Sequence, residues 1–229
     1  MPHRAAAGPP AAILFDLDGT LIDTYRLYLE SYRRALEPHL GCAPSDAEIA
    51  DRHPSSERLF LVDWLGAEAG AACHTEVRRW YAALHGSLGE GMYEGAREML
   101  DALRSAGYPL GIVTGKGRDA WAVTEAAIDL GPFAVVVTDD DVRAAKPDPG
   151  GLLAAADALG IAPGEAVYIG DTASDMRAGS NAGMRIGAAL WAKTAPGERD
   201  AFLRSIESTA PDWTFDRPAD VTRAFAGWC

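Results

Sequence analysis

Residues 11–24, AAILFDLDGTLIDT, decide the fold of this chain. An apolar run over residues 11–15 ends in Asp16, and Asp18 follows one residue later. Because the run is short and neither of its alternating faces carries a polar residue, it predicts a strand buried on both faces of a parallel sheet. Asp18-Gly19 alone could be a simple turn, but a turn does not account for Asp16 directly against a buried strand. The two carboxylates would stand where open α/β sheets bind ligands.

Composition limits the classes of protein to which the chain can belong. The 229 residues allow one or two domains, and 48% apolar and 24% charged residues are ordinary for a globular protein. A net charge of −12 argues against a nucleic-acid partner, and an anionic substrate would need a locally positive site.

The terminus and the cysteines suggest the compartment. Residues 1–10 lack the apolar core of a secretory signal, so we expect a disordered leader, and no run approaches a membrane span. Cys42, Cys73 and Cys229 form no close pair and show no zinc spacing. We therefore expect a cytoplasmic protein without a membrane partner.

Helical periodicity without a convincing strand marks the region after the opening motif. Helices are predicted over residues 24–39, 45–52, 56–65 and 75–88, with Thr24 as a possible N-cap and Ser45 and Glu48 as a capping box. The glycines at 89 and 91 indicate a hinge. We predict an all-helical cap domain over residues 24–89, and a core domain formed by residues 11–23 and 90–229.

Beyond residue 93, predicted helices and strands alternate. Helices are expected over residues 95–105, 118–130, 151–159 and 199–208, and a further helix follows residues 170–175 and ends at about residue 182. Strands are expected over residues 110–113, 133–137, 166–169, 185–189 and 213–215, the last at a sheet edge. This alternation predicts an α/β fold with a doubly wound parallel sheet.

Polar side chains follow several of these strands. They are Asp16, Asp18, Thr114, Lys146, Asp171 and Asp175. Each has an ordinary explanation alone, as a turn, a solvated lysine or a helix cap, but in a doubly wound sheet all of them can converge on one edge. Carboxylates can supply a nucleophile, a proton carrier and ligands for Mg²⁺, while a hydroxyl and an ammonium hold phosphoryl oxygens.

Four stretches carry a family resemblance over nearly the whole chain: DLDGTLIDT, IVTGK, AAKPDP and IGDTASDMRAGSNAG. The chain resembles the haloacid dehalogenase (HAD) superfamily, and its helical insert after the first motif resembles the C1 cap of the phosphoglycolate phosphatase-like subfamily. The resemblance implies a Rossmann-like core, a cap that closes over the substrate, and a Mg²⁺-dependent phosphatase acting as a monomer or homodimer on a small phosphorylated metabolite.

The resemblance also implies roles for individual residues. Asp16 would attack phosphorus to form an aspartyl-phosphate, and Asp18 would protonate the leaving oxygen and then activate water. The magnesium site would comprise Asp16, the carbonyl of Asp18, Asp171, and Asp175, which would orient the metal's water shell or Lys146. The phosphoryl group would be bound by Thr114, Gly115 and Lys146, with Thr114 and Lys146 also counted as catalytic.

Other activities of the superfamily differ in the residues they need. Asp18 argues against a haloacid dehalogenase, because a halide leaves without a proton. A phosphonate hydrolase of this fold would need a cap lysine for its Schiff base, and Lys116, Lys146 and Lys193 all lie outside the insert. A β-phosphoglucomutase-like isomerase shares the four motifs and remains an alternative.

Two alternatives belong to other protein classes. A receiver-type signalling module would be shorter and capless, and an inactive binding homologue would be expected to lack a motif residue, whereas none is missing here.

The substrate depends on the cap. Relatives often carry a Gly-x-Pro-like loop between cap helices, whereas residues 52–56 here read RHPSS, which puts phosphoglycolate itself in doubt. Arg52 and His53 could bind a polar leaving group, or they could be solvated surface residues.

Overall fold

The computed structural model describes residues 8–50, 52, 57–89 and 91–227. Most of the expected leader, most of the loop at 52–56 and the middle of the expected hinge at 89–91 lie outside these residues, as does His53. None of the described helices is both long enough and apolar enough to cross a bilayer.

A six-stranded parallel sheet forms the centre of the molecule, in the order β5-β4-β1-β6-β7-β8. The strands are β1 (Ala12–Phe15), β4 (Leu110–Val113), β5 (Val135–Val137), β6 (Ala166–Gly170), β7 (Arg185–Ala189) and β8 (Trp213–Phe215). β1 is fully buried, and its Ile13 pairs with Leu110 on one side and Val167 on the other. The predicted α/β fold with a doubly wound parallel sheet is confirmed, and β8 is an edge strand as expected.

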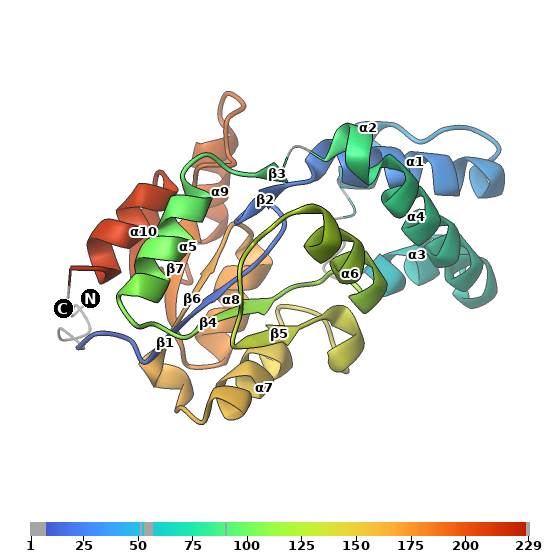
Figure 1. Ribbon diagram of the computed structural model, residues 1–229. Coiled ribbons are helices and arrows are strands. Elements are labelled where there is room, and N and C mark those ends of the chain that lie inside the picture. Colours follow the sequence, from blue (N-terminus) through green and yellow to red (C-terminus); the bar gives the residue numbers. More distant parts are fainter. Residues whose placement is uncertain (1–7, 51, 53–56, 90, 228–229) are drawn as a thin grey trace.

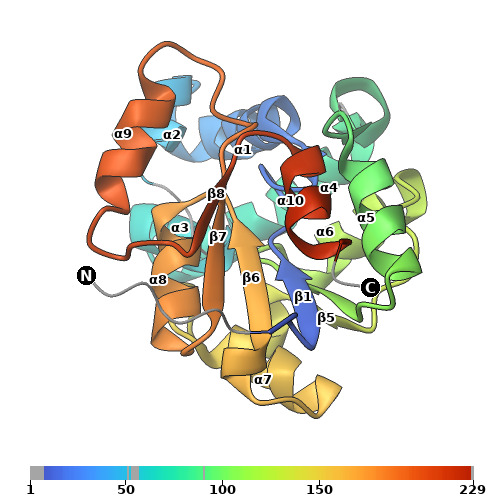
Figure 2. The same ribbon diagram turned by 90° about the vertical axis from the view of Figure 1, so that its left-hand side faces the viewer.

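Alternate residues of β1 serve two hydrophobic cores, one on each face of the sheet. Ile13 and Phe15 pack in a cluster with α5 (Ala96–Ser105), α6 (Arg118–Ala127) and α10 (Pro218–Phe225). Leu14 packs in a second cluster with α7 (Gly150–Leu159) and α8 (Ala173–Asn181), and α9 (Glu198–Ser205) extends the cover beside α8. Figure 2 shows α5 and α10 on one side of the sheet and α8 on the other. This two-sided burial explains why β1 has no polar face.

The helical insert lies beyond the carboxyl ends of the strands (Figure 1). It comprises α1 (Tyr25–Leu40), α2 (Asp46–Ala50), α3 (Glu57–Leu65) and α4 (Ala67–Leu88), which enclose a hydrophobic cluster of their own. Tyr32 and Phe60 lie at its centre, with ring centroids 5.1 Å apart. The capping box of α2 forms as predicted, because the Ser45 amide donates to the Glu48 carboxylate and the Glu48 amide donates to the Ser45 hydroxyl.

Helix α4 begins at Ala67 rather than near residue 75, where the periodic pattern starts. Its first turns are rich in alanine and glycine, and a Cβ on Gly70 would come within 2.6 Å of the Leu61 carbonyl oxygen of α3. Small residues allow this close approach of two helices, but they also remove the apolar periodicity from which a helix is predicted.

The shortest elements and the last helix of the chain were not predicted from the sequence. β2 (Ile22–Asp23) and β3 (Gly91–Met92) form an antiparallel pair where the chain enters and leaves the insert. Two residues are too few to show strand periodicity. Helix α10 and two 3₁₀ turns, Asp139–Asp141 and Pro163–Glu165, were also absent from the prediction.

Candidate active site

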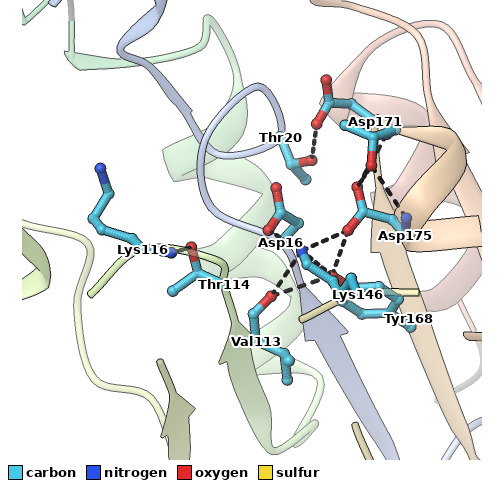
Figure 3. A network of polar contacts seen from close by, with 10 residues as sticks. Asp16, Thr20, Val113, Thr114, Lys116, Lys146, Tyr168, Asp171 and Asp175 are labelled. Carbon is cyan, nitrogen blue, oxygen red and sulfur yellow. Dashed lines mark hydrogen bonds and ion pairs between the residues drawn. The ribbon is translucent and has the colours of Figure 1, made fainter. Parts of the chain in front are cut away.

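The candidate site lies where the strand order reverses around β1. Asp16 follows β1, and Thr114 and Asp171 follow its two neighbours, β4 and β6. Lys146 comes from the loop between β5 and α7, and Asp175 from the first turn of α8. The structure therefore brings five of the predicted residues to the carboxyl edge of the sheet (Figure 3), which is the usual ligand position in open α/β folds.

The Lys146 ammonium is the centre of this group. It lies 2.7 Å from Oδ1 of Asp16, 2.6 Å from Oδ1 of Asp175 and 3.0 Å from the hydroxyl oxygen of Tyr168. Burial alone would lower the pKa of Lys146, but the charges of Asp16 and Asp175 outweigh burial and raise this pKa well above its ordinary value. The lysine is therefore a permanent cation in a largely buried position.

Asp175 is fully buried and held ionised. Its Oδ1 accepts from Lys146 and from the Tyr168 hydroxyl at 2.9 Å, and its Oδ2 accepts from the backbone amide and hydroxyl of Thr172. Burial raises its pKa, but the Lys146 charge and these hydrogen bonds outweigh burial and lower it. Asp175 is 0% exposed, and with Thr172 it forms the capping box of α8, so the helix-cap explanation also holds. In addition, Asp175 fixes the position of Lys146.

The pKa values of Asp16 and Asp171 shift upward, in the opposite direction from the pKa of Asp175. Burial raises the pKa of both, and the charge of Asp175 raises each further. Lys146 opposes this effect on Asp16, and Lys193, whose Nζ lies 2.6 Å from Oδ2 of Asp171, opposes it on Asp171. The two carboxylates remain short of positive charge.

The loop after β1 fits closely against Asp171. Thr20 donates its hydroxyl to Oδ1 of Asp171 at 3.3 Å. Gly19 has φ of 81°, and a Cβ there would lie 2.5 Å from Oδ2 of Asp171. Glycine is required at this position by its backbone conformation and by the proximity of the carboxylate.

Three buried carboxylates could share a cation. One oxygen from each of Asp16, Asp171 and Asp175 lies within 4.8 Å of the others. Carboxylate oxygens suit Mg²⁺, and a divalent charge would relieve the crowding of Asp16 and Asp171. The side chain of Asp18 does not belong to this cluster.

Asp18 faces the insert. Its Oδ1 accepts from the Thr24 hydroxyl and lies 3.1 Å from Nζ of Lys116, which in turn donates to the Tyr81 hydroxyl of α4 at 3.0 Å. Thr24 stands at the N-cap of α1 as predicted, but its side chain makes no capping hydrogen bond because the hydroxyl is used for Asp18. The side chain of Asp18 is 36% exposed.

Sequence patterns missed several members of the site. They are Thr20, Tyr81, Lys116, Tyr168 and Lys193. Thr20 and Lys116 lie inside two of the quoted family stretches, and the Tyr168 hydroxyl is the polar group in an otherwise apolar strand, so each carried a weak signal. Lys193 and Tyr81 carried none, because a loop lysine and a helix tyrosine are common elsewhere.

The predicted substrate-binding residues are divided between two places. Thr114, Gly115 and Lys146 line one cavity of about 20 Å³, which has room for about one water molecule. Arg52 is exposed, and its guanidinium lies 4.2 Å from the ring centroid of Trp64 within the insert. The contacts of Arg52 and His53 with a leaving group remain predictions.

Known proteins resemble this chain over almost its entire length. A family model described as haloacid dehalogenase-like hydrolase matches residues 13–189. The pyrophosphatase PpaX of Bacillus velezensis is 35% identical over 213 residues, covering 92% of this chain and 94% of that protein. A solved hydrolase from Pseudomonas syringae is 26% identical with a TM-score of 0.75, covering 94% of this chain and 97% of its own. A predicted phosphoglycolate phosphatase from Haemophilus somnus, at 23% identity and a TM-score of 0.72 over 93% and 97% of the two chains, shows likeness of fold.

Opposite effects on stability are expected from two isosteric substitutions in metal-free buffer. Asp16→Asn should raise the free energy of unfolding at pH 7.5 by about 1 kcal/mol, and Asp175→Asn should lower it by about 2 kcal/mol or more. The raised pKa of Asp16 means that its ionisation removes stability as pH rises above the ordinary aspartate range, whereas the lowered pKa of Asp175 means that its charge adds stability that is lost as pH falls. Thermal unfolding in EDTA at pH 7.5 and pH 4 measures both, and the gain from Asp16→Asn should shrink at pH 4. The reverse ranking at pH 7.5 would contradict the assigned charges.

Proposed function

The chain belongs to the haloacid dehalogenase-like hydrolase family and is a phosphatase-type enzyme, and we propose that it hydrolyses a small phosphorylated metabolite through a phosphoenzyme on Asp16. The observation that carries the proposal is the placement of Asp16. Its carboxylate follows the buried β1, lies 2.7 Å from the Lys146 ammonium, and has Thr114 at the end of the neighbouring strand. An ammonium and a hydroxyl at this point would draw phosphoryl oxygens toward the nucleophile.

Lys146 and Thr114 would hold the phosphoryl group during attack, with Gly115 beside them. The Lys146 charge reduces the repulsion between the Asp16 carboxylate and an incoming phosphate, which would otherwise prevent the two anions from meeting. Asp175 and the Tyr168 hydroxyl keep the ammonium in position. We assign Asp175 to this positioning role in preference to direct contact with a metal, because both of its oxygens already accept hydrogen bonds.

Asp18 would carry the proton. It is partly exposed, unlike Asp16, so it can exchange a proton with water, and the Thr24 hydroxyl orients it at the entry to the insert. In the first step it would protonate the leaving oxygen, and in the second it would take a proton from the water that hydrolyses the aspartyl-phosphate. The insert, residues 24–89, would act as the cap over this site.

Mg²⁺ is the proposed cofactor. Asp16 and Asp171 would hold it through carboxylate oxygens and Asp18 through its carbonyl, and when bound the ion would polarise the phosphoryl group and balance the buried acids. Thr20 and Lys193 would orient Asp171 for this role.

The relatives indicate a phosphorylated substrate but do not identify it. The relative from Bacillus velezensis is named a pyrophosphatase, and pyrophosphate is one member of the panel on which this chain should be tested. A mutase related to β-phosphoglucomutase would use the same residues, but it would move phosphate between hydroxyls of one sugar without releasing it.

Phosphate release from a panel of phosphorylated metabolites, pyrophosphate and p-nitrophenyl phosphate tests the reaction. Wild-type protein with Mg²⁺ should release phosphate, and Asp16→Asn should lower turnover at least about a thousandfold because it removes the attacking charge while keeping the shape. Asp101→Asn, which changes an exposed acid on α5, is the matched control and should retain full turnover. Near-normal turnover in pure Asp16→Asn protein would rule out the phosphoenzyme.

Asp18→Asn should separate substrates by their leaving groups. Esters of aliphatic alcohols need a proton on the departing oxygen, so their kcat should fall by about 100-fold or more. p-Nitrophenolate leaves readily without a proton, so formation of the phosphoenzyme from p-nitrophenyl phosphate should be much less affected. Single-turnover burst kinetics measure this step, and equal losses for both kinds of ester would remove Asp18 from the acid role.

Metal dependence should appear both in stability and in activity. Mg²⁺ at millimolar concentration should raise the Tm of wild-type protein, since it binds the folded state, and Asp171→Asn should abolish most of this shift. EDTA should abolish phosphate release, Mg²⁺ should restore it, and Ca²⁺ should inhibit because it tolerates larger and looser coordination. Full turnover in metal-free buffer would contradict the assignment.

A further inference from the structure

All three lysines of this acidic chain lie at the candidate site. Lys146 pairs with Asp16 and Asp175, Lys193 pairs with Asp171 at 2.6 Å, and Lys116 lies 3.1 Å from Asp18. The proposed mechanism explains Lys146, which faces the phosphoryl group, and Lys193, which orients Asp171. Lys116 has no role in it.

Lys116 is the most buried of the three, with 4% of its side chain exposed. Its ammonium contacts the Tyr81 hydroxyl at 3.0 Å and lies 4.2 Å from the centroid of the same ring. Its acidic partner, Asp18, is by contrast 36% exposed. A cation this deeply buried is costly, and an anion that enters the site would interact with it more strongly than with a solvated lysine.

The position of Lys116 separates it from the phosphoryl site. Figure 3 shows its side chain directed away from Lys146 and from the cluster around Asp16. It adjoins Asp18 on one side and helix α4 of the insert on the other. Because Asp18 is the proposed proton donor to the leaving oxygen, atoms of the leaving group must lie near Asp18 and hence within reach of Lys116.

Helix α4 adds two further polar groups at this place. The Tyr81 hydroxyl lies 2.9 Å from the Thr124 hydroxyl of α6, which fixes its orientation. His85, one helical turn later, is 6% exposed, its ring centroid lies 5.4 Å from that of Tyr81, and its Nε2 has no hydrogen-bond partner among the described residues. Burial and the Lys116 charge lower the pKa of His85, so the imidazole is neutral near pH 7 and can donate one N–H without adding charge.

We propose that Lys116, with Tyr81 and His85, forms a leaving-group subsite for a second anionic group of the substrate, a phosphate or a carboxylate. The proposal rests on the proposed phosphatase reaction and specifies its substrate class. An oxyanion of the leaving group would accept hydrogen bonds from the ammonium and the imidazole, while the Tyr81 hydroxyl, which accepts from the ammonium and is held by Thr124, keeps Lys116 in position. A neutral sugar would gain little from a buried ammonium, so the subsite favours diphosphates or phosphorylated acids over sugar phosphates.

The test compares two kinds of substrate in matched variants. The leaving group of pyrophosphate carries a phosphate, and that of 2-phosphoglycolate carries a carboxylate. The leaving group of glucose 6-phosphate is a neutral sugar, and that of p-nitrophenyl phosphate is aromatic. Lys116→Gln removes the charge and should lower kcat/KM at least about 30-fold for one or both anionic substrates, but less than about threefold for the other two. Lys116→Arg should recover part of the preference, and Tyr81→Phe should raise KM for the same anionic substrate more than it lowers kcat. Arg118→Gln, which removes an exposed cation at the start of α6, is the control and should leave the ratio of kcat/KM values unchanged.

Equal losses on all four substrates, or no loss on any, would overturn the subsite while leaving the phosphatase assignment intact. If wild-type protein hydrolyses none of the four, the proposed reaction fails, and binding then decides the subsite separately. Calorimetric titration of Asp16→Asn with pyrophosphate in Mg²⁺ should give an affinity that drops at least about 30-fold when Lys116→Gln is added. An unchanged affinity would exclude Lys116 from binding the second anionic group. If Lys116→Gln does not fold, Lys116→Arg and Tyr81→Phe carry the same comparison.

Discussion

A buried ammonium between two carboxylates is the interaction on which the rest of the site depends. Lys146 lies within 2.7 Å of both Asp16 and Asp175, which come from different elements of the fold. Without its charge, two buried acids at the carboxyl edge of the sheet would repel each other and one would take up a proton. Tyr168 supports the arrangement from β6, since its hydroxyl donates to Asp175 and contacts Lys146. The strand ends can therefore concentrate negative charge and still accept an anionic substrate.

The site is nevertheless arranged for binding more than for stability. The pKa of Asp16 and that of Asp171 are raised by burial, although each acid has a lysine partner. Their ionised forms therefore cost free energy in the absence of a further cation, and a bound divalent ion would recover this cost. Functional sites commonly hold such unfavourable charge because the ligand that compensates it is the one that the protein must bind.

The insert takes part in the site through Thr24, which binds Asp18, and through helix α4. Helix α4 contacts α6 through a small apolar cluster that includes Leu27, Tyr81 and Ala120, through the Arg78–Asp119 ion pair, and through the Tyr81–Thr124 hydrogen bond. The same Tyr81 contacts Lys116 and thereby Asp18. Any movement of the insert relative to the core would change the surroundings of Asp18 directly, so the proposed proton transfer and the proposed recognition of the leaving group depend on the same contacts.

The sequence by itself determined the sheet and the residues at its carboxyl edge, whereas only the tertiary structure decided how those residues are paired. Two-sided burial removes polar residues from β1 and β4, and parallel strands bring their carboxyl ends together, so Asp16, Thr114 and Asp171 could be placed from pattern alone. Elements with weak patterns were missed: β2 and β3 are too short for periodicity, and small residues packed against α3 conceal the start of α4. The partners of Asp18 and Asp171 were also missed, because Lys116 and Lys193 reach them across gaps of many residues in the chain. Such contacts depend on strand register and helix packing, which bring together side chains that no local pattern relates.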